Sequence, residues 1–107
     1  MNFNVEVTSK FKRNFKQLLK KYPSLSHEFI VLINSLEIDP KQGKPLGHDC
    51  FKIRLSIGSK GKGKSGGARV ITHVHISNTT VFLIAIYDKS EQASISDKEI
   101  LSYIKDI

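Results

Sequence analysis

The sequence predicts an α+β fold, with the element order β-α-α-β-β-β-α and an antiparallel-rich four-stranded sheet that carries its helices on one face. Three observations lead to this prediction. Apolar residues recur at helical spacing in residues 9–38, they alternate with polar residues from residue 50 onward, and a helix-capping pattern returns at residue 96. The 107 residues have the length of a single domain, which we place at 1–107.

The first strand and the first helix follow each other directly. Phe3, Val5 and Val7 alternate with polar side chains, which is the pattern of a half-buried strand. Thr8 or Ser9 then provides the N-cap of a helix. Aromatic residues and leucines keep helical spacing in this helix, and lysines and an arginine occupy most of its other positions. It is therefore apolar inside and basic outside.

A second helix begins after the Pro23-Ser24 break and ends near Asp39, because a residue that precedes proline avoids helical angles. Its apolar positions are Leu25, Phe29, Leu32, Ile33 and Leu36. Two consecutive helices predict an antiparallel helical hairpin. Residues 41–49 contain glycines and a proline, so we predict a loop there.

Alternation identifies two strands in the second half of the chain. One extends from Phe51 to Ile57 and the next from Arg69 to Ile76, with a glycine- and lysine-rich loop between them. Pairing them as a hairpin would gather basic side chains on one sheet face: Lys52, Arg54, Arg69, His73 and His75.

The last strand and helix complete the order. Residues 80–87, TVFLIAIY, are apolar on both faces, as expected of a central strand. The capping-box pattern from Ser96 to Glu99 then begins a short final helix. With all helices predicted on one face of the sheet, the other face, which carries the cations, would be exposed or bound to a partner.

Positive charge is concentrated in the middle of the chain. The formal net charge is +7, and within residues 41–75 the only acid is Asp49. The basic residues of this segment are Lys41, Lys44, Lys52, Arg54, Lys60, Lys62, Lys64 and Arg69. A field of this sign attracts polyanions, such as nucleic acid or an acidic protein segment.

Several classes of protein are disfavoured. Gly58 to Ser65 matches the G-x-x-x-x-G-K-S pattern of phosphate-binding loops, but a strand-forming segment follows where a nucleotide hydrolase needs a helix. Cys50 is the single cysteine, so we predict no internal disulfide. The sequence has no apolar run long enough to span a membrane, and its first residues lack the apolar stretch of a signal peptide. We expect a cytoplasmic location and no membrane contact.

Two segments carry a resemblance to a known family. KIRLSIGSKGKGKSGGARVI (52–71) resembles a strand-loop-strand unit with a Gly/Lys loop and a following arginine, and LIAIYDKSEQASIS (83–96) resembles a final strand with a Tyr-x-Lys end. Both are similar to the RelE/ParE superfamily of bacterial toxins, in particular its HigB-like branch. KKYPSL (20–25) adds weaker support.

The resemblance implies a function. Toxins of this kind belong to type II toxin-antitoxin modules, act as ribosome-dependent endoribonucleases on mRNA, need no metal or other cofactor, and are silenced by a cognate antitoxin. The expected partners are therefore an antitoxin, the ribosome and mRNA, with no small-molecule cofactor. ParE-like members share the fold and act on DNA gyrase instead, and a non-catalytic basic module that binds nucleic acid is a further alternative.

Metal-independent RNA cleavage needs a base for the 2′-hydroxyl, an acid for the leaving 5′-oxygen and a clamp for the charged phosphorane. Arg69 is our first candidate for the clamp and Arg54 the second. Tyr87, Lys89 and Lys64 are candidate proton carriers, because neighbouring cations lower the pKa of both lysine and tyrosine. Their individual roles stay open.

The remaining basic residues have auxiliary roles in this hypothesis. Lys52, Lys60 and Lys62 would hold phosphates. His73 and His75 are a titratable pair on the same face as Arg69, which makes them rivals for the acid and base roles and candidates for RNA binding. No metal site is predicted, since no third ligand stands at suitable spacing from the two histidines.

Overall fold

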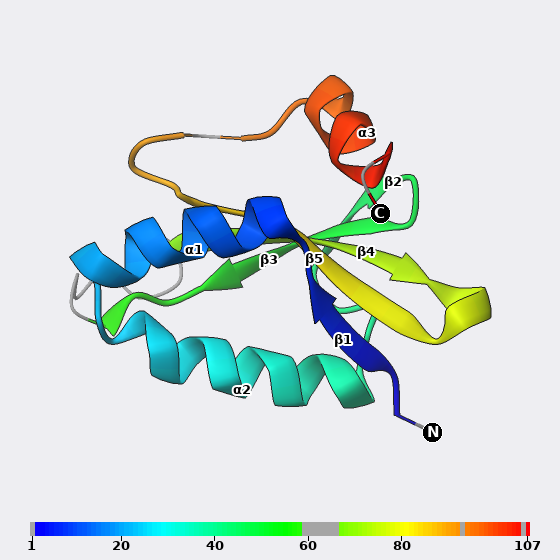
Figure 1. Cartoon of the computed structure of the whole chain (residues 1–107), viewed down its shortest axis with the longest axis horizontal. Helices are drawn as coiled ribbons and strands as arrows, with labels where there is room; N and C mark the ends of the chain where they lie inside the picture. Colours follow the sequence, from blue (N-terminus) through cyan, green and yellow to red (C-terminus); the bar gives the residue numbers. More distant parts are fainter. Residues whose placement is uncertain (1, 59–66, 93, 106) are drawn as a thin grey trace.

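The computed structural model describes residues 2–58, 67–92, 94–105 and 107. Figure 1 shows three helices arranged around a twisted sheet. The helices are α1 (Ser9–Lys21), α2 (Leu25–Ile38) and α3 (Asp97–Lys105), with a short 3₁₀ helix η3 (Ile76–Asn78). The strands are β1 (Asn4–Val7), β2 (Lys44–Gly47), β3 (Cys50–Leu55), β4 (Ala68–His75) and β5 (Thr80–Asp88).

The sheet has five strands in the order β1-β5-β4-β3-β2. β1 is parallel to β5, and every other neighbouring pair is antiparallel. The predicted α+β class is therefore confirmed, and the hairpin of β3 and β4 forms as expected. The predicted order lacked one strand, because β2 lies within the segment that we predicted to be a loop.

A tight turn explains why β2 was missed. His48 and Asp49 both have left-handed φ angles, 55° and 58°, between the paired residues Gly47 and Cys50. Two left-handed residues in a two-residue connection form the type of turn that suits the twist of a hairpin. The usual sequence signal for this turn is Asn-Gly or Asp-Gly, and His-Asp does not resemble it.

The face of the sheet that carries α1 and α2 holds the larger core. Thr8 caps α1 by accepting a hydrogen bond from the backbone N–H of Phe11 at 3.2 Å. Phe11 stacks on Phe15 and on Phe29 of α2, so the two helices share an aromatic contact above the sheet. The fully buried side chains of this core include Leu25, Leu36, Ile57, Val70, Val74, Val81, Leu83 and Ile86.

The opposite face is covered in part by α3, which corrects the prediction that all helices lie on one face (Figure 1). Ile100 of α3 packs in a second cluster with Ile71 of β4 and Tyr87 of β5. The register between β4 and β5 shifts between Ile71 and Thr72, and the adjacent residues Ile84 and Ala85 both join this cluster. A strand that is apolar on both faces needs cover on both, and α3 provides the second cover.

Candidate functional site

A cleft of about 580 Å³ opens where β2, β3 and β4 lie side by side. Its lining residues are Gln42, Gly43, Lys44, Lys52, Ile53, Arg54, Arg69 and Lys89. Five of them carry a positive charge and none of these eight is acidic. We call this hollow the cationic cleft. Its charge suits it to bind an anionic group.

Cross-strand pairing explains why the cations converge. Arg54 is paired with Arg69 across β3 and β4, and Lys44 is paired with Lys52 across β2 and β3. Like charges directly opposite each other destabilise a sheet. An anion bound between these pairs would relieve the repulsion, so the arrangement favours a negatively charged ligand.

Arg69 is held more firmly than a surface arginine. Its side chain is only 3% exposed, and Nη1 donates a hydrogen bond to the carbonyl oxygen of Ala68 at 3.1 Å. Arg69 is therefore not an exposed surface arginine, although it lines the cleft. A buried guanidinium with a fixed orientation can present its planar fork to a phosphate with little loss of side-chain entropy. Arg54, opposite it, is exposed.

Burial and the neighbouring cations affect the pKa of Lys52. Burial lowers the pKa of Lys52, and the charges of Lys44, Arg69, Arg54 and Lys89 lower it further. Both causes favour the neutral amine, which can accept a proton. From the sequence alone, the pKa-lowering effect of neighbouring cations is expected at Tyr87, Lys89 and Lys64, and Lys52 is expected only to hold phosphate.

Lys89 follows the last residue of β5 and lines the cationic cleft with an exposed side chain. Its backbone N–H donates to the carbonyl oxygen of Gly67 at 3.1 Å, which ties it to the start of β4. The predicted residues Lys60, Lys62 and Lys64 lie outside the described residues, so their roles stay predictions.

Tyr87 shares the row of Arg54 and Arg69 but does not line the cleft. It is 7% exposed and packs against Ile71 and Ile100 under α3. Burial raises the pKa of Tyr87, the charge of Arg69 lowers it in part, and Glu99 raises it. The expectation that this pKa falls was therefore wrong. The phenol hydroxyl is buried and has no hydrogen-bond partner within the described parts of the chain.

His73 and His75 lie farther along β4, outside the cleft lining. Four residues of strand separate Arg69 from His73 by about 13 Å. His73 is paired with Cys50, whose Sγ lies 3.6 Å from Nδ1 of the imidazole. Burial raises the pKa of the Cys50 thiol to about 11, so it stays protonated at neutral pH. Among the described residues, no cluster of three or more His, Cys, Asp and Glu side chains could hold a metal ion.

A larger hollow, of about 770 Å³, lies elsewhere, beside β1 and the start of α1. Its lining mixes the cations Lys10, Lys12 and Arg13 with Glu6 and with apolar side chains from β1, β5 and the C-terminal region. The positive charge is less concentrated there, and the paired cations found in the cationic cleft are absent from its lining. We therefore place the candidate site in the smaller hollow.

Comparison with known proteins agrees with this fold. Residues 10–106 match the model of a family described as the RelE toxin of the RelE/RelB toxin-antitoxin system. The chain belongs to the RelE toxin family. Among solved structures, it is similar to a mutant of the E. coli toxin RelE in the free state, with 20% identity, a TM-score of 0.67 and coverage of 97% of this chain and 99% of that one.

Two antitoxin-bound relatives show the same fold. The RelBE2 complex of Mycobacterium tuberculosis matches with 20% identity and a TM-score of 0.58, covering 82% of this RelE-family chain and 92% of its own. The intact E. coli RelBE complex matches with 20% identity and a TM-score of 0.52, covering 80% and 95%. RelE toxins thus form complexes with antitoxins. The assignment to the HigB-like branch stays a prediction.

One cation of this RelE-family site, Lys44, is not among the site residues predicted from the sequence. Lys44 enters the cleft because β2 pairs with β3, and β2 was not predicted. The only signal available was its place in the basic middle segment. Every helix within the described residues is too short or too polar to cross a lipid bilayer.

Proposed function

We propose that this RelE-family toxin cleaves mRNA on the ribosome without a metal ion. The observation that carries the proposal is the cationic cleft, in which a buried arginine lies between two lysines on neighbouring strands. Lys52 and Lys89 are both diagonal neighbours of Arg69, on β3 and at the end of β5, and lie toward opposite ends of β4. Diagonal neighbours lie about 7–8 Å apart, which long side chains can span.

This diagonal matches the geometry of the reaction. When the 2′-oxygen attacks phosphorus, the 5′-oxygen leaves on the opposite side, so the base and the acid must stand on either side of the phosphate. Lys52, with its lowered pKa, accepts the proton of the 2′-hydroxyl. Lys89 donates a proton to the leaving 5′-oxygen. The products are a 2′,3′-cyclic phosphate and a 5′-hydroxyl end.

Arg69 carries the largest share of transition-state stabilisation in this proposal. The phosphorane bears more negative charge on its non-bridging oxygens than the substrate does, and the fixed guanidinium faces that charge. Arg54, being exposed, binds the flanking backbone phosphate, as does Lys44. Tyr87 does not transfer protons in this scheme, because it lies under α3 and its pKa is raised.

The partners follow from the family and from charge. A cognate antitoxin binds and silences the toxin in this proposal, and toxin and antitoxin are bound together in the complexes named above. An acidic antitoxin segment over the cationic cleft would relieve the repulsion between its paired cations. The ribosome and mRNA supply the polyanionic surface that the net charge of +7 favours.

Cleavage is tested with purified protein, ribosomes carrying a defined mRNA and primer extension of the products. The expected result is cuts in phase with the ribosome for the natural chain and for Lys105→Ala, an exposed lysine outside the cleft lining. Arg69→Ala should lose about 10²- to 10³-fold in rate. Intact mRNA with damaged DNA after induction would support a gyrase poison instead, and salt-sensitive binding without any cut would indicate a plain binding module.

A further inference from the structure

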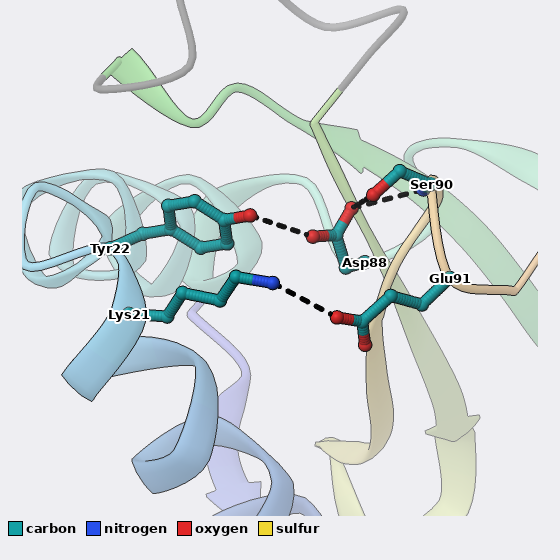
Figure 2. A network of polar contacts seen from close by, with 5 residues as sticks. All are labelled: Lys21, Tyr22, Asp88, Ser90 and Glu91. Carbon is teal, nitrogen blue, oxygen red and sulfur yellow. Dashed lines mark hydrogen bonds and ion pairs between the residues drawn. The ribbon is translucent and has the colours of Figure 1, made fainter.

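A polar network ties the end of β5 to the end of α1 (Figure 2). The hydroxyl of Tyr22 donates a hydrogen bond to Oδ2 of Asp88 at 3.1 Å. Oδ1 of Asp88 accepts two hydrogen bonds from Ser90, one from the backbone N–H at 3.0 Å and one from the hydroxyl at 2.8 Å. Both carboxylate oxygens are therefore engaged, and residues 66 positions apart are held together.

The burial of the Asp88 carboxylate is the energetically unfavourable part of this network, which suggests that the network serves the function of the site. Asp88 is only 1% exposed, and burial of a carboxylate is unfavourable unless hydrogen bonds replace its water. Asp88 lies directly between Tyr87 and Lys89. Because successive side chains on a strand point to opposite faces, Asp88 is directed toward α1 while Lys89 reaches the cationic cleft.

The backbone around Lys89 is fixed on both sides. On one side, its N–H donates to the carbonyl oxygen of Gly67. Gly67 sits where an added Cβ would lie 2.1 Å from the carbonyl oxygen of Leu55, so the chain approaches β3 too closely for any side chain. On the other side, the carbonyl oxygen of Asp88 accepts hydrogen bonds from the N–H groups of Glu91 and Gln92. The backbone position from which the Lys89 side chain extends is therefore fixed.

We propose that Tyr22 and Asp88 are positioning residues, which hold the backbone of Lys89 so that its amine reaches the scissile phosphate. This inference rests on the proposed function, in which Lys89 donates the proton to the leaving oxygen. A displacement of about 1 Å can cost about 100-fold in rate, so a lysine on an untethered turn would be a much poorer acid. Loss of the tether should affect catalysis more than RNA binding.

A neighbouring contact provides the matched control. Lys21 and Glu91 form an ion pair at 3.1 Å beside the network, with side chains that are 55% and 60% exposed (Figure 2). Exposed ion pairs of this kind contribute little to the free energy of folding. Asp88→Asn and Glu91→Gln make the same chemical change, carboxylate to carboxamide, within one turn of chain. Only the first alters the tether.

The first measurement needs no activity. Hydrogen-deuterium exchange at the Lys89 amide reports directly on the bond to Gly67 in the full chain. Protection at this amide should fall at least about tenfold in Tyr22→Phe and Asp88→Asn, since local opening exposes it, and should be unchanged in Glu91→Gln. Unchanged protection in Tyr22→Phe and Asp88→Asn would overturn the proposal, whether or not the protein cleaves RNA.

The second measurement is a double-mutant cycle on the single-turnover cleavage rate. Tyr22→Phe should lower the rate about tenfold while ribosome binding stays within twofold, and should have no further effect in a Lys89→Ala background. An undiminished effect in that background means that Tyr22 acts on overall structure, which overturns the positioning role. Failure of the proposed function looks different, because the natural chain would then leave mRNA intact, and failure of the proposed site would leave Arg69→Ala and Lys89→Ala cleaving at the natural rate.

Discussion

Two parts of the same sheet face have opposite chemistry although they share strands. Under α3, Ile71, Ala85 and Tyr87 pack against Ile100 in an apolar cluster. Beyond α3, Lys52 and Arg69 line the cationic cleft, and each lies two residues or one strand from a member of that cluster. Alternation along a strand selects the face of a side chain, whereas the short helix α3 decides which part of that face is dry.

Burial favours the neutral form in both parts, with opposite consequences. In Tyr87 the neutral form keeps its proton, so the raised pKa makes this residue a poor base. In Lys52 the neutral form lacks its proton, so the lowered pKa makes it a better base. One physical effect thus suppresses proton transfer on one side of the boundary and promotes it on the other.

The largest effect is expected from a change to Arg69, the residue that we propose clamps the phosphorane. Arg69→Lys keeps the charge but loses the planar fork, and we expect the single-turnover cleavage rate to fall about 100-fold. Arg13→Lys, at an exposed position of α1, is the matched control and should change the rate less than twofold. A fully active Arg69→Lys variant would mean that charge alone, without a fixed guanidinium, defines the cleft.

The apolar part is tested through the cover that α3 provides. Ile100→Ala should lower the free energy of unfolding by about 2–4 kcal/mol, because it leaves a cavity in a buried cluster. Leu101→Ala, at a neighbouring position that is 45% exposed, should cost much less. Denaturant unfolding measures both. Equal effects of the two substitutions would show that α3 does not seal this part of the face.

Removing the buried hydroxyl of Tyr87 tests where the apolar cluster ends and the cationic cleft begins. Tyr87→Phe should raise the free energy of unfolding by up to about 1 kcal/mol, because it removes a buried polar group that lacks a partner among the described residues. The cleavage rate should stay within twofold. A large loss of cleavage would place Tyr87 in contact with the substrate and break the comparison, since the hydroxyl would then have to leave its cover.

The smallest effect is a pair of opposite slopes in the pH dependence of stability. The folded pKa of Lys52 lies below its usual 10.5, so the unfolded chain binds more protons between the two values and stability rises with pH there. The folded pKa of Tyr87 lies above its usual 10.0, so stability falls with pH above 10. Lys52→Met and Tyr87→Phe should each remove one slope in unfolding curves measured from pH 7 to 11. Slopes of the same sign would contradict the division.

Much of the fold could be predicted from the sequence, because hydrophobic periodicity depends on local geometry. Alternation identified β3, β4 and β5 and correctly placed Lys52, Arg54 and Arg69 on one face. The type of turn at His48 and Asp49 could not be read from composition, and the strand β2 was lost with it.

The misassigned environment of Tyr87 has a different cause. Its row and face follow from the register, but its burial depends on where α3 docks, and docking is a property of tertiary packing. The same holds for the tether of Asp88 at the end of β5, whose partner Tyr22 is the C-cap residue of α1. Contacts between distant segments therefore account for these two failures, whereas the omission of Lys44 follows from the local turn at His48 and Asp49.

The pairing of β1 with β5 has a consequence for biosynthesis. Asn4 to Val7 are synthesised well before their partners, Thr80 to Leu83. The sheet cannot close until β5 has been made, because β5 lies between β1 and β4. Nascent chains that stop before β5 thus lack both the closed sheet and the strand that leads into Lys89. A host cell would therefore meet the folded toxin only after β5 has been synthesised.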